Sequence, residues 1–420
     1  QNPEWLDMFS DADYVLTYSD WAKEVIDSHS GDTTNTVGSA SPSASDEFKQ
    51  MDKKAVRAEL GIPTDINIIG TVMRNQRRKL FPALIESFSQ YLKETKSTNT
   101  YLYLHTSFPD AGWDLASLMQ NHEVSSRILM TYVCSDAECQ HVECSFFRDA
   151  KKGCSKCGKY SSVASSVSNG VSDEVLAKIY NSFDLYIQLA NSEGFGLPQV
   201  EAAACGVPIA CTNYSAMEDV VQKLGAYPID FELYKELETG CDRAVPKIDS
   251  VVNVFKNFFK MDEQGKLRAS ENTRSLFEEH YSWDKTAEAW MKIIDECEYA
   301  DWNAPARMRP MPPKDMKLEA ANAEDFIEKV FGIFSFYPSH NNSWFSRSIL
   351  TDFIRGTTRS GYDGYYVSQF SPFSDIKPRT VQPQQIIDTM YNRLANYNNW
   401  ENMRVNKNSL DDKRSQTWLI

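Results

Sequence analysis

The sequence predicts an α/β protein with a doubly wound parallel sheet, and three observations indicate this fold class. Short apolar segments alternate with longer amphipathic segments from about residue 53 to residue 224. The apolar segments are bounded by Gly, Pro, Asn, Asp and Ser, which commonly end strands. Their residues are apolar in unbroken runs, as expected for strands that are covered on both faces. Alternation of such strands with helices predicts a parallel sheet between two layers of helices.

The individual elements follow in order. The predicted strands are rich in Ile, Leu, Val and Tyr and lie at 66–73, 100–105, 128–133, 185–189 and 208–211. The predicted helices have apolar residues at helical spacing and lie at 53–60, 81–93, 115–120, 173–181, 197–205, 216–224 and 283–298. Ligands of open parallel sheets bind beyond the carboxyl ends of the strands. We therefore expect one cleft to be lined by the loops at 73–79, 105–112, 133 and 190–197.

Both ends of the chain depart from this pattern. Residues 13–19 read as a buried strand that ends in a helix cap, and a helix at 21–27 follows. Residues after 28 are rich in Ser, Thr, Gly and Asp, which predicts a flexible linker. The predicted division is the end of one domain at 1–27, a linker at 28–52, a main domain at 53–300, a proline-rich linker at 301–319 and a C-terminal region without assigned role at 320–420.

Composition and charge exclude several classes of protein. The 420 residues are 42% hydrophobic and 24% charged, as in ordinary globular proteins. No apolar run approaches the roughly 18 residues of a membrane span. The net charge of −14 argues against non-specific binding to nucleic acid or anionic membranes. Five of the nine cysteines fall in one short window, which favours a metal site and a reducing, cytoplasmic compartment over a disulfide framework.

The strongest functional signal is the segment Asn191–Ile209, between a predicted strand and a predicted helix. Pro198 stands at the start of that helix, where its missing N–H costs nothing. Gly194 and Gly196 allow a ligand to approach the backbone closely. The helix N-terminus offers free N–H groups and the positive end of the helix dipole. This arrangement suits a diphosphate or a sugar hydroxyl.

The same segment holds two carboxylates, Glu193 and Glu201, which can accept hydrogen bonds from adjacent sugar hydroxyls. Glycine and proline around two acidic residues are also common in ordinary strand–helix turns. The complete string NSEGFGLPQVEAAACGVPI, however, closely resembles the E-x7-E signature of GT-B glycosyltransferases of the family-4 type. The resemblance includes the trailing A-x-A-x-G-x-P-[IV] pattern.

A second match supports the first. Residues 70–79 follow the first strand of the predicted sheet, where this family carries an Arg and, a few residues on, a Lys that reach the donor diphosphate. Arg74 and Lys79 match those two positions. Arg77 and Arg78 stay as alternatives, and a solvated basic turn is the other interpretation of the cluster.

The resemblance implies a glycosyltransferase that retains anomeric configuration, takes a UDP- or GDP-sugar and needs no catalytic metal. It implies that Arg74 and Lys79 neutralise the diphosphate, where charge develops in the transition state. Glu193 would bind the transferred sugar, and Glu201 would hold the ribose hydroxyls. The other donor-binding candidates lie in the glycine loop or at strand ends: Gly194, Phe195, Gly196, Leu197, the base contacts Tyr132 and Val133, and His105.

The resemblance also implies the domain organisation of a GT-B enzyme, over roughly residues 10–300. Residues 13–19 resemble the last strand of the N-terminal, acceptor-side Rossmann domain. Residues 281–283 and the helix after them resemble the family's closing helix. We therefore expect the main domain to be the donor half of a chain that is truncated at its N-terminus, or of one whose remainder lies elsewhere.

The cysteine window predicts a second site. Cys134-x4-Cys139 and Cys154-x2-Cys157 resemble a zinc ribbon whose first knuckle is widened. Four thiolates predict a closed, structural zinc site in an insertion at residues 134–157. Cys144 and His141 are alternatives to Cys139, and a cluster of unligated thiols is the alternative to a metal site.

Two alternative functions stay open at this point. One is a non-catalytic nucleotide-sugar or protein-binding module built on half of a GT-B fold. The other is a phage-type glycosyltransferase that acts on DNA bases, for which the ribbon and the nearly neutral C-terminal region leave room. The predicted partners are therefore a small-molecule donor and an acceptor that is a glycan, a lipid, a protein or modified DNA.

Overall fold

The computed structural model describes residues 14–30, 37–108, 110–147, 153–237 and 239–297. Tyr14–Asp295 form one compact unit, to which the following description refers. The predicted linker at 301–319 and the C-terminal region at 320–420 lie outside the described residues. The domain boundaries given above stay predictions.

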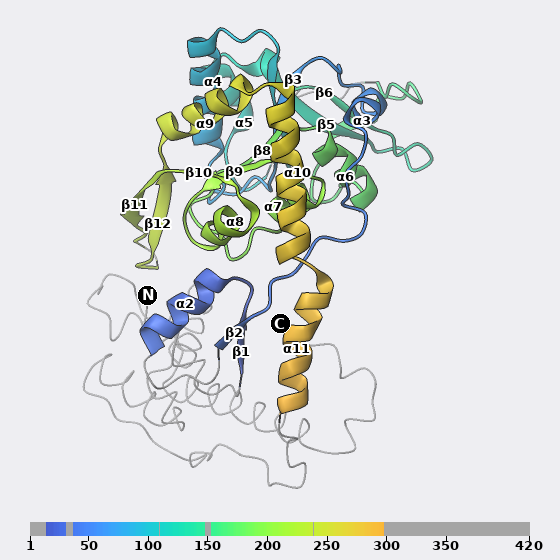
Figure 1. Ribbon diagram of the computed structural model, residues 1–420. Helices are drawn as coiled ribbons and strands as arrows, with labels where there is room; N and C mark the ends of the chain where they lie inside the picture. Colours follow the sequence, from blue (N-terminus) through green and yellow to red (C-terminus); the bar gives the residue numbers. More distant parts are fainter. Residues whose placement is uncertain (1–13, 31–36, 109, 148–152, 238, 298–420) are drawn as a thin grey trace, which may run out of the picture. The chain divides into compact units, whose positions relative to one another are not determined.

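An eight-stranded sheet lies at the centre of this unit (Figure 1). Its main path runs through β10 (Tyr227–Ile229), β9 (Ile209–Thr212), β8 (Leu185–Gln188), β3 (Asn67–Val72), β4 (Thr100–His105), β5 (Ile128–Cys134) and β6 (Val142–Phe146). All pairs from β10 to β5 are parallel, which confirms the predicted fold class. β6 and β7 (Ser162–Ala164) both pair antiparallel with β5.

Helices cover both faces of the sheet (Figure 1). One core packs the sheet against α4 (Phe81–Thr95), α5 (Leu115–Asn121) and α9 (Ile248–Lys260). The other packs it against α3 (Lys53–Glu59), α6 (Asp173–Asn181), α7 (Leu197–Ala204), α8 (Ala216–Leu224) and α10 (Glu263–His280). Ile68 and Ile69 of β3 are both fully buried, one in each core. Successive strand side chains point to opposite faces, so burial on both faces requires the unbroken apolar runs seen in the sequence.

Local signals set several helix starts. Asp52 caps α3 by accepting hydrogen bonds from Lys54 N and Ala55 N. Asp114 and Asp262 cap α5 and α10 in the same way. Each cap satisfies a backbone N–H that the first helical turn leaves without a partner.

The remaining elements lie around this body. They are β1 (Val15–Thr17), α2 (Asp20–Ser30), β2 (Val37–Ser39), the short helix η2 (Ser125–Arg127), the hairpin of β11 (Phe231–Lys235) and β12 (Asp242–Pro246), and α11 (Trp283–Glu296). β1 pairs in parallel with β2. The side chain of Asp219 on α8 accepts hydrogen bonds from Asp20 N and Trp21 N at the start of α2.

The structure differs from the sequence-based prediction in two stretches. Residues 28–52 were expected to be a flexible linker, yet they contain the end of α2 and strand β2. Ala44 and Phe48 also enter one of the two cores. Residues 225–282, for which no element was predicted, hold β10, the β11–β12 hairpin, α9 and α10. α10 buries only Thr273 and Phe277, so its sequence carries almost no apolar periodicity.

Candidate functional site

A cavity of about 450 Å³ lies beyond the carboxyl ends of β3, β4 and β8, and we call it the carboxyl-edge cavity. Its lining comes from the loops after these strands, from the start of α7 and from the chain after β7. The lining residues are Val72, Met73, Arg74, Arg78, Lys79, His105, Thr106, Ser107, Ser165, Ser166, Val167, Gly170, Glu193, Gly196, Leu197 and Pro198. This is the edge at which parallel sheets bind ligands, as predicted from the topology.

Glu193 is the centre of the charge network in this cavity. Its side chain is only 6% exposed and forms ion pairs with Lys79 and with Arg78, whose Nη1 lies 2.7 Å from Oε2. Gln188 Nε2 donates to Oε1 over 3.1 Å, and Glu193 N donates to Ser215 Oγ over 2.8 Å. The buried carboxylate is thus fully partnered, as a buried charge requires.

Lys79 and Arg78 differ in their access to solvent. The side chain of Lys79 is 7% exposed, and this burial lowers its pKa, while Glu193 acts in the opposite direction. Arg78 is 46% exposed. Arg78 can therefore turn toward a ligand in the cavity at little cost, whereas Lys79 is held beside Glu193.

Arg74 and His105 lie on the same cavity. Arg74 is exposed and forms a two-pronged ion pair with Asp110, with Nε–Oδ2 at 2.8 Å and Nη2–Oδ1 at 3.2 Å. His105 Nδ1 lies 2.8 Å from Thr131 Oγ1, and burial lowers the histidine pKa to about 4. His105 is therefore neutral at pH 7 and offers a hydrogen bond rather than a charge.

The start of α7 supplies backbone groups to the cavity. Gly196 has a φ of +94° and precedes the helix, and a Cβ there would lie 2.4 Å from Gln199 Oε1. The Gln199 side chain is fully buried, and its amide atoms have no hydrogen-bond partner among the described residues. Gly194 is exposed, and a Cβ there would meet nothing within 4 Å.

Five predicted donor-binding residues, Gly194 and the four described next, are not among those that line the cavity. Phe195 packs edge-on against Tyr281, with ring centroids 6.0 Å apart. Tyr132 and Val133 lie within β5, where they are 1% and 4% exposed, so the structure does not bring them to the cavity as predicted. Glu201 accepts a hydrogen bond of 2.7 Å from the Tyr180 hydroxyl, and burial raises the pKa of Glu201 to about 7.

Sequence reasoning missed part of the lining. Arg78 was considered only as an alternative, yet it joins Lys79 on Glu193. Ser165, Ser166 and Thr106 were not considered. Ser and Thr residues carry no pattern of their own, and the only available signal was the position of residue 106 in the predicted loop at 105–112.

The four predicted metal ligands do come together. The sulfur atoms of Cys134, Cys139, Cys154 and Cys157 all lie within 4.8 Å of one another, and we call this group the cysteine cluster. Two of the distances, Cys134–Cys157 and Cys139–Cys154, are 3.8 Å. A tetrahedral zinc site with Zn–S bonds of about 2.3 Å has S–S edges of about 3.8 Å. The predicted grouping is confirmed, and it includes neither Cys144 nor His141.

The parallel sheet, the cavity at its carboxyl edge and the basic residues around a buried carboxylate define an α/β domain with a charged cavity where parallel sheets bind ligands. Comparison with known families gives the class more closely. Residues 163–244 match the family model described as glycosyl transferases group 1. This match contains Glu193, α7 and the chain that follows β7, and it supports glycosyl transfer as the class of activity.

Individual relatives agree with this class. The chain is 40% identical over 55 residues to O-antigen chain mannosyltransferase B of Escherichia coli, which is 13% of this chain and 14% of that protein. It is 21% identical over 208 residues to D-inositol 3-phosphate glycosyltransferase of Geodermatophilus obscurus, which is 50% of this chain and 39% of that protein. The chain thus spans well under half the length of both relatives.

Solved structures show the same fold. Sucrose-phosphate synthase of Thermosynechococcus elongatus superposes with a TM-score of 0.50 at 16% identity, over 70% of this chain and 60% of that chain. Over the aligned part, the chain therefore shares its fold with GT-B glycosyltransferases. No helix among the described residues is long and apolar enough to cross a membrane.

Proposed function

We propose that this chain binds a nucleoside-diphosphate sugar, a UDP- or GDP-sugar, in the carboxyl-edge cavity, and that the sugar is transferred to an acceptor with retention of configuration. One observation carries the proposal. The cavity gathers Arg74, Arg78 and Lys79 from one loop and Glu193 from another, directly in front of the α7 N-terminus. Three cations and free backbone N–H groups suit a diphosphate.

In this proposal the basic residues act on the leaving group. Lys79 and Arg74 neutralise the diphosphate as negative charge develops on it, so no metal takes part in the transfer itself. Arg78 is shared between Glu193 and the phosphates, since it is half exposed and reaches both the carboxylate and the cavity. This role for Arg78 is added to the pair expected from the resemblance.

Carboxylates bind the sugars. Glu193 accepts hydrogen bonds from the transferred sugar and is held in place by Lys79 and Gln188. Glu201 accepts hydrogen bonds from the ribose hydroxyls. Its carboxylate also accepts the hydrogen bond from the Tyr180 hydroxyl. The backbone from Gly194 to Leu197 borders the phosphates.

The cysteine cluster is proposed to hold one structural zinc ion. Four thiolates complete a tetrahedron and leave no open position for water, so the metal serves the fold and not the transfer. Elemental analysis of the purified protein should give about one zinc per chain. A value near zero would overturn this assignment. A reducing compartment, the cytoplasm, belongs to the same proposal because the thiols must stay reduced.

Calorimetry tests the donor site directly. The protein is titrated with UDP, GDP, ADP and dTDP, and binding of at least one of them is expected. Arg74→Ala should weaken that binding, whereas Lys53→Ala, a similar loss of charge at the opposite edge of the sheet, should not. Absence of binding by all four nucleotides at millimolar concentration contradicts the proposal. Nucleotide binding without any sugar transfer by the protein would instead support a binding module.

A further inference from the structure

The cysteine cluster and the carboxyl-edge cavity are connected by a short piece of chain. Cys157 is followed by β7, and the residues directly after β7 line the cavity. We call residues 165–170 the cavity wall. Its members Ser165, Ser166, Val167 and Gly170 line the same cavity as Glu193 and the α7 N-terminus.

The cluster fixes the strand that leads into the wall. Cys134 is the last residue of β5 and lies opposite Ser162 in the β5–β7 pair. Its sulfur lies 3.0 Å from Ser161 Oγ, and Ser135 N donates to Ser161 O over 2.8 Å. Cys134, a predicted metal ligand, is therefore held directly beside the start of β7.

Further hydrogen bonds hold the cavity wall, which follows β7. Ser165 N donates to Thr131 O over 3.0 Å, and Ser165 Oγ donates to Thr106 O over 3.2 Å. Ser166 and Asn169 exchange two backbone hydrogen bonds of 3.1 Å, which closes the turn of the wall. The start of the wall is thus tied both to β5 and to the loop after β4.

The base of the insertion is held by the sheet and the cores: β6 pairs with β5 over five residues, and Cys144 and Ala164 each pack against a core. The cysteine cluster lies farther from both cores. Cys134 and Cys154 are buried, yet neither belongs to either of the two cores. Near the cluster, the two segments are joined by the Lys159–Asp136 ion pair, in which Lys159 is 57% exposed, and by hydrogen bonds of Ser135 with Ser161. β7 is only three residues long, and its Ala164 packs at the margin of one core. Exposed ion pairs contribute about 0–1 kcal/mol.

We propose that a metal ion on the cysteine cluster orders β7 and the cavity wall, so that metal occupancy sets the affinity of the carboxyl-edge cavity for a nucleoside diphosphate. The inference rests on the proposed function for its ligand. Structural zinc supplies folding free energy to small elements that lack a core. When the wall is ordered in only about one tenth of the molecules, the apparent dissociation constant rises about tenfold.

Hydrogen exchange tests the first half of the proposal without any nucleotide. Zinc is removed from the full-length protein with a chelator and then restored. Exchange at residues 162–170 should become faster without zinc and return with it, whereas β8 and β9, which are buried in the two cores, should not change. Unchanged exchange at residues 162–170 would overturn the inference, whether or not a nucleotide binds.

Binding tests the second half. The nucleotide among UDP, GDP, ADP and dTDP that binds the zinc-loaded protein should bind about tenfold more weakly after zinc removal. Cys139→Ser should reproduce this loss, and Cys297→Ser, at an exposed cysteine outside the cluster, should not. If Cys139→Ser does not fold, the chelated and reconstituted wild-type protein provides the same comparison.

Reciprocal coupling gives a further check. Because linkage is mutual, a saturating nucleotide should raise the equilibrium affinity for zinc, measured by competition with a chromophoric chelator, by a similar factor. Equal nucleotide affinity with and without zinc would reject the inference and leave the proposed donor site intact. Absence of nucleotide binding by the zinc-loaded protein would reject the proposed function, and the exchange experiment would still decide whether zinc orders the wall.

Discussion

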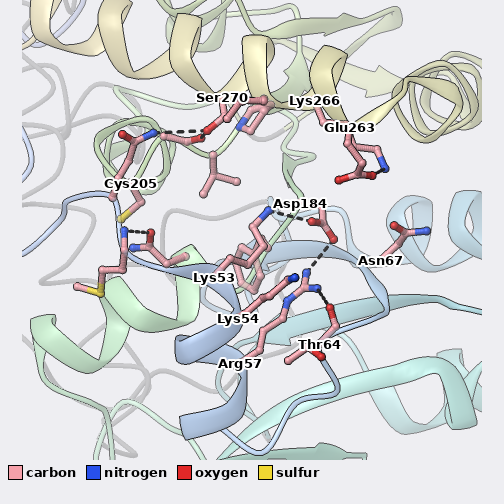
Figure 2. Close-up of a pocket in the computed structure, with 18 of the residues that line it drawn as sticks. Lys53, Lys54, Arg57, Thr64, Asn67, Asp184, Cys205, Glu263, Lys266 and Ser270 are labelled. Carbon is pink, nitrogen blue, oxygen red and sulfur yellow. Dashed lines mark hydrogen bonds and ion pairs between the residues drawn. The ribbon is translucent and has the colours of Figure 1, made fainter.

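Two cavities lie at opposite edges of the central sheet, and each contains a carboxylate between two cations. At the carboxyl edge, Glu193 pairs with Arg78 and Lys79. At the amino edge, a cavity of about 640 Å³ surrounds Asp184, which pairs with Arg57 at 2.8 Å and Lys53 at 2.9 Å (Figure 2). We call it the amino-edge cavity. It is the larger of the two, yet it is not the site we propose.

The difference lies in how the polar groups around the ion pairs are satisfied. Arg57 is 3% exposed and also donates to Ser182 O over 2.9 Å and to Ile66 O over 2.7 Å. Asp184 also accepts a hydrogen bond from Ile68 N over 2.7 Å. This network joins α3 to the start of β3 and to the start of β8. Its groups are occupied by the fold itself, so it stabilises the domain.

The cations of the carboxyl-edge cavity are more accessible to a ligand. Arg74 and Arg78 are each paired with a carboxylate, yet they are about half exposed, at 52% and 46%. The Thr106 hydroxyl, which lines this cavity, is buried without a hydrogen-bond partner among the described residues. Buried polar groups without partners are costly, so they point to a ligand that completes them. The exposure of the polar groups and their hydrogen-bond partners distinguish the two cavities better than volume does.

The largest expected effect is a loss of stability, without a loss of nucleotide binding, when the ion pair at the amino edge is broken. Arg57→Ala leaves Asp184 without its buried partner and should reduce the free energy of unfolding by about 3 kcal/mol. Lys53→Ala, at a residue 44% exposed, should cost less than about 1 kcal/mol. Urea unfolding measures both changes. If Arg57→Ala instead weakens nucleotide binding by the folded protein, the amino-edge network takes part in binding and does not only stabilise the domain.

At the carboxyl edge, we expect substitutions to weaken nucleotide binding. Lys79→Met removes a buried charge-assisted contact to the diphosphate and should weaken nucleotide binding about 100-fold, roughly 2.7 kcal/mol. Arg77→Met is the matched control, because Arg77 lies in the same loop but packs over the Trp113 ring at 4.8 Å. Calorimetry compares the two variants. An equal loss in both would assign the effect to loop charge in general and not to the cavity.

A smaller effect concerns the pH dependence of Glu201. Its pKa is raised by burial from 4.5 to about 7, so the folded protein binds a proton that the unfolded chain has released between these values. The stability contributed by this proton is complete below pH 4.5 and is lost as the pH rises through 7. Wild type should therefore lose about 1–2 kcal/mol more stability than Glu201→Gln between pH 5 and pH 8.

Urea unfolding of both proteins at the two pH values measures this difference, in which the other titrating groups cancel. The carboxylate form is the one that accepts hydrogen bonds from ribose hydroxyls. Nucleotide binding by wild type should therefore strengthen over the range in which its stability falls. Parallel pH profiles for wild type and Glu201→Gln would remove Glu201 from the proposed site.

The fold of the sheet was predictable because its signals are local. β4, α6 and α8 have the predicted bounds, since buried strands must be apolar on both faces and amphipathic helices repeat every turn. The grouping of the four cysteines was predictable for a related reason. Each knuckle brings its two cysteines close within a few residues, and only one long-range contact then remains to be formed.

The side-chain directions in the carboxyl-edge cavity were not predictable in the same way. Phe195 stands between two candidate ligand residues in the sequence, yet it turns to Tyr281, which arrives from the distant end of α10. Lys79 reaches Glu193 because the backbone of Lys79 pairs with Ala190 in an isolated bridge. Such contacts depend on where separate loops meet, and the spacing of residues within one loop does not predict them.

The smallest expected effect lies within the glycine loop itself and tests whether backbone shape matters at the carboxyl edge. Gly196→Ala places a Cβ at a φ of +94° and 2.4 Å from Gln199 Oε1, whereas Gly194→Ala meets open space. A left-handed conformation costs a non-glycine residue about 1–2 kcal/mol. Relief of this strain shifts the first N–H groups of α7, so nucleotide binding should weaken about fivefold in Gly196→Ala and less in Gly194→Ala. Calorimetry with the same nucleotide separates the two variants. Equal affinities would mean that the α7 N-terminus does not contact the diphosphate, and the cations of the 74–79 loop would then carry the binding alone.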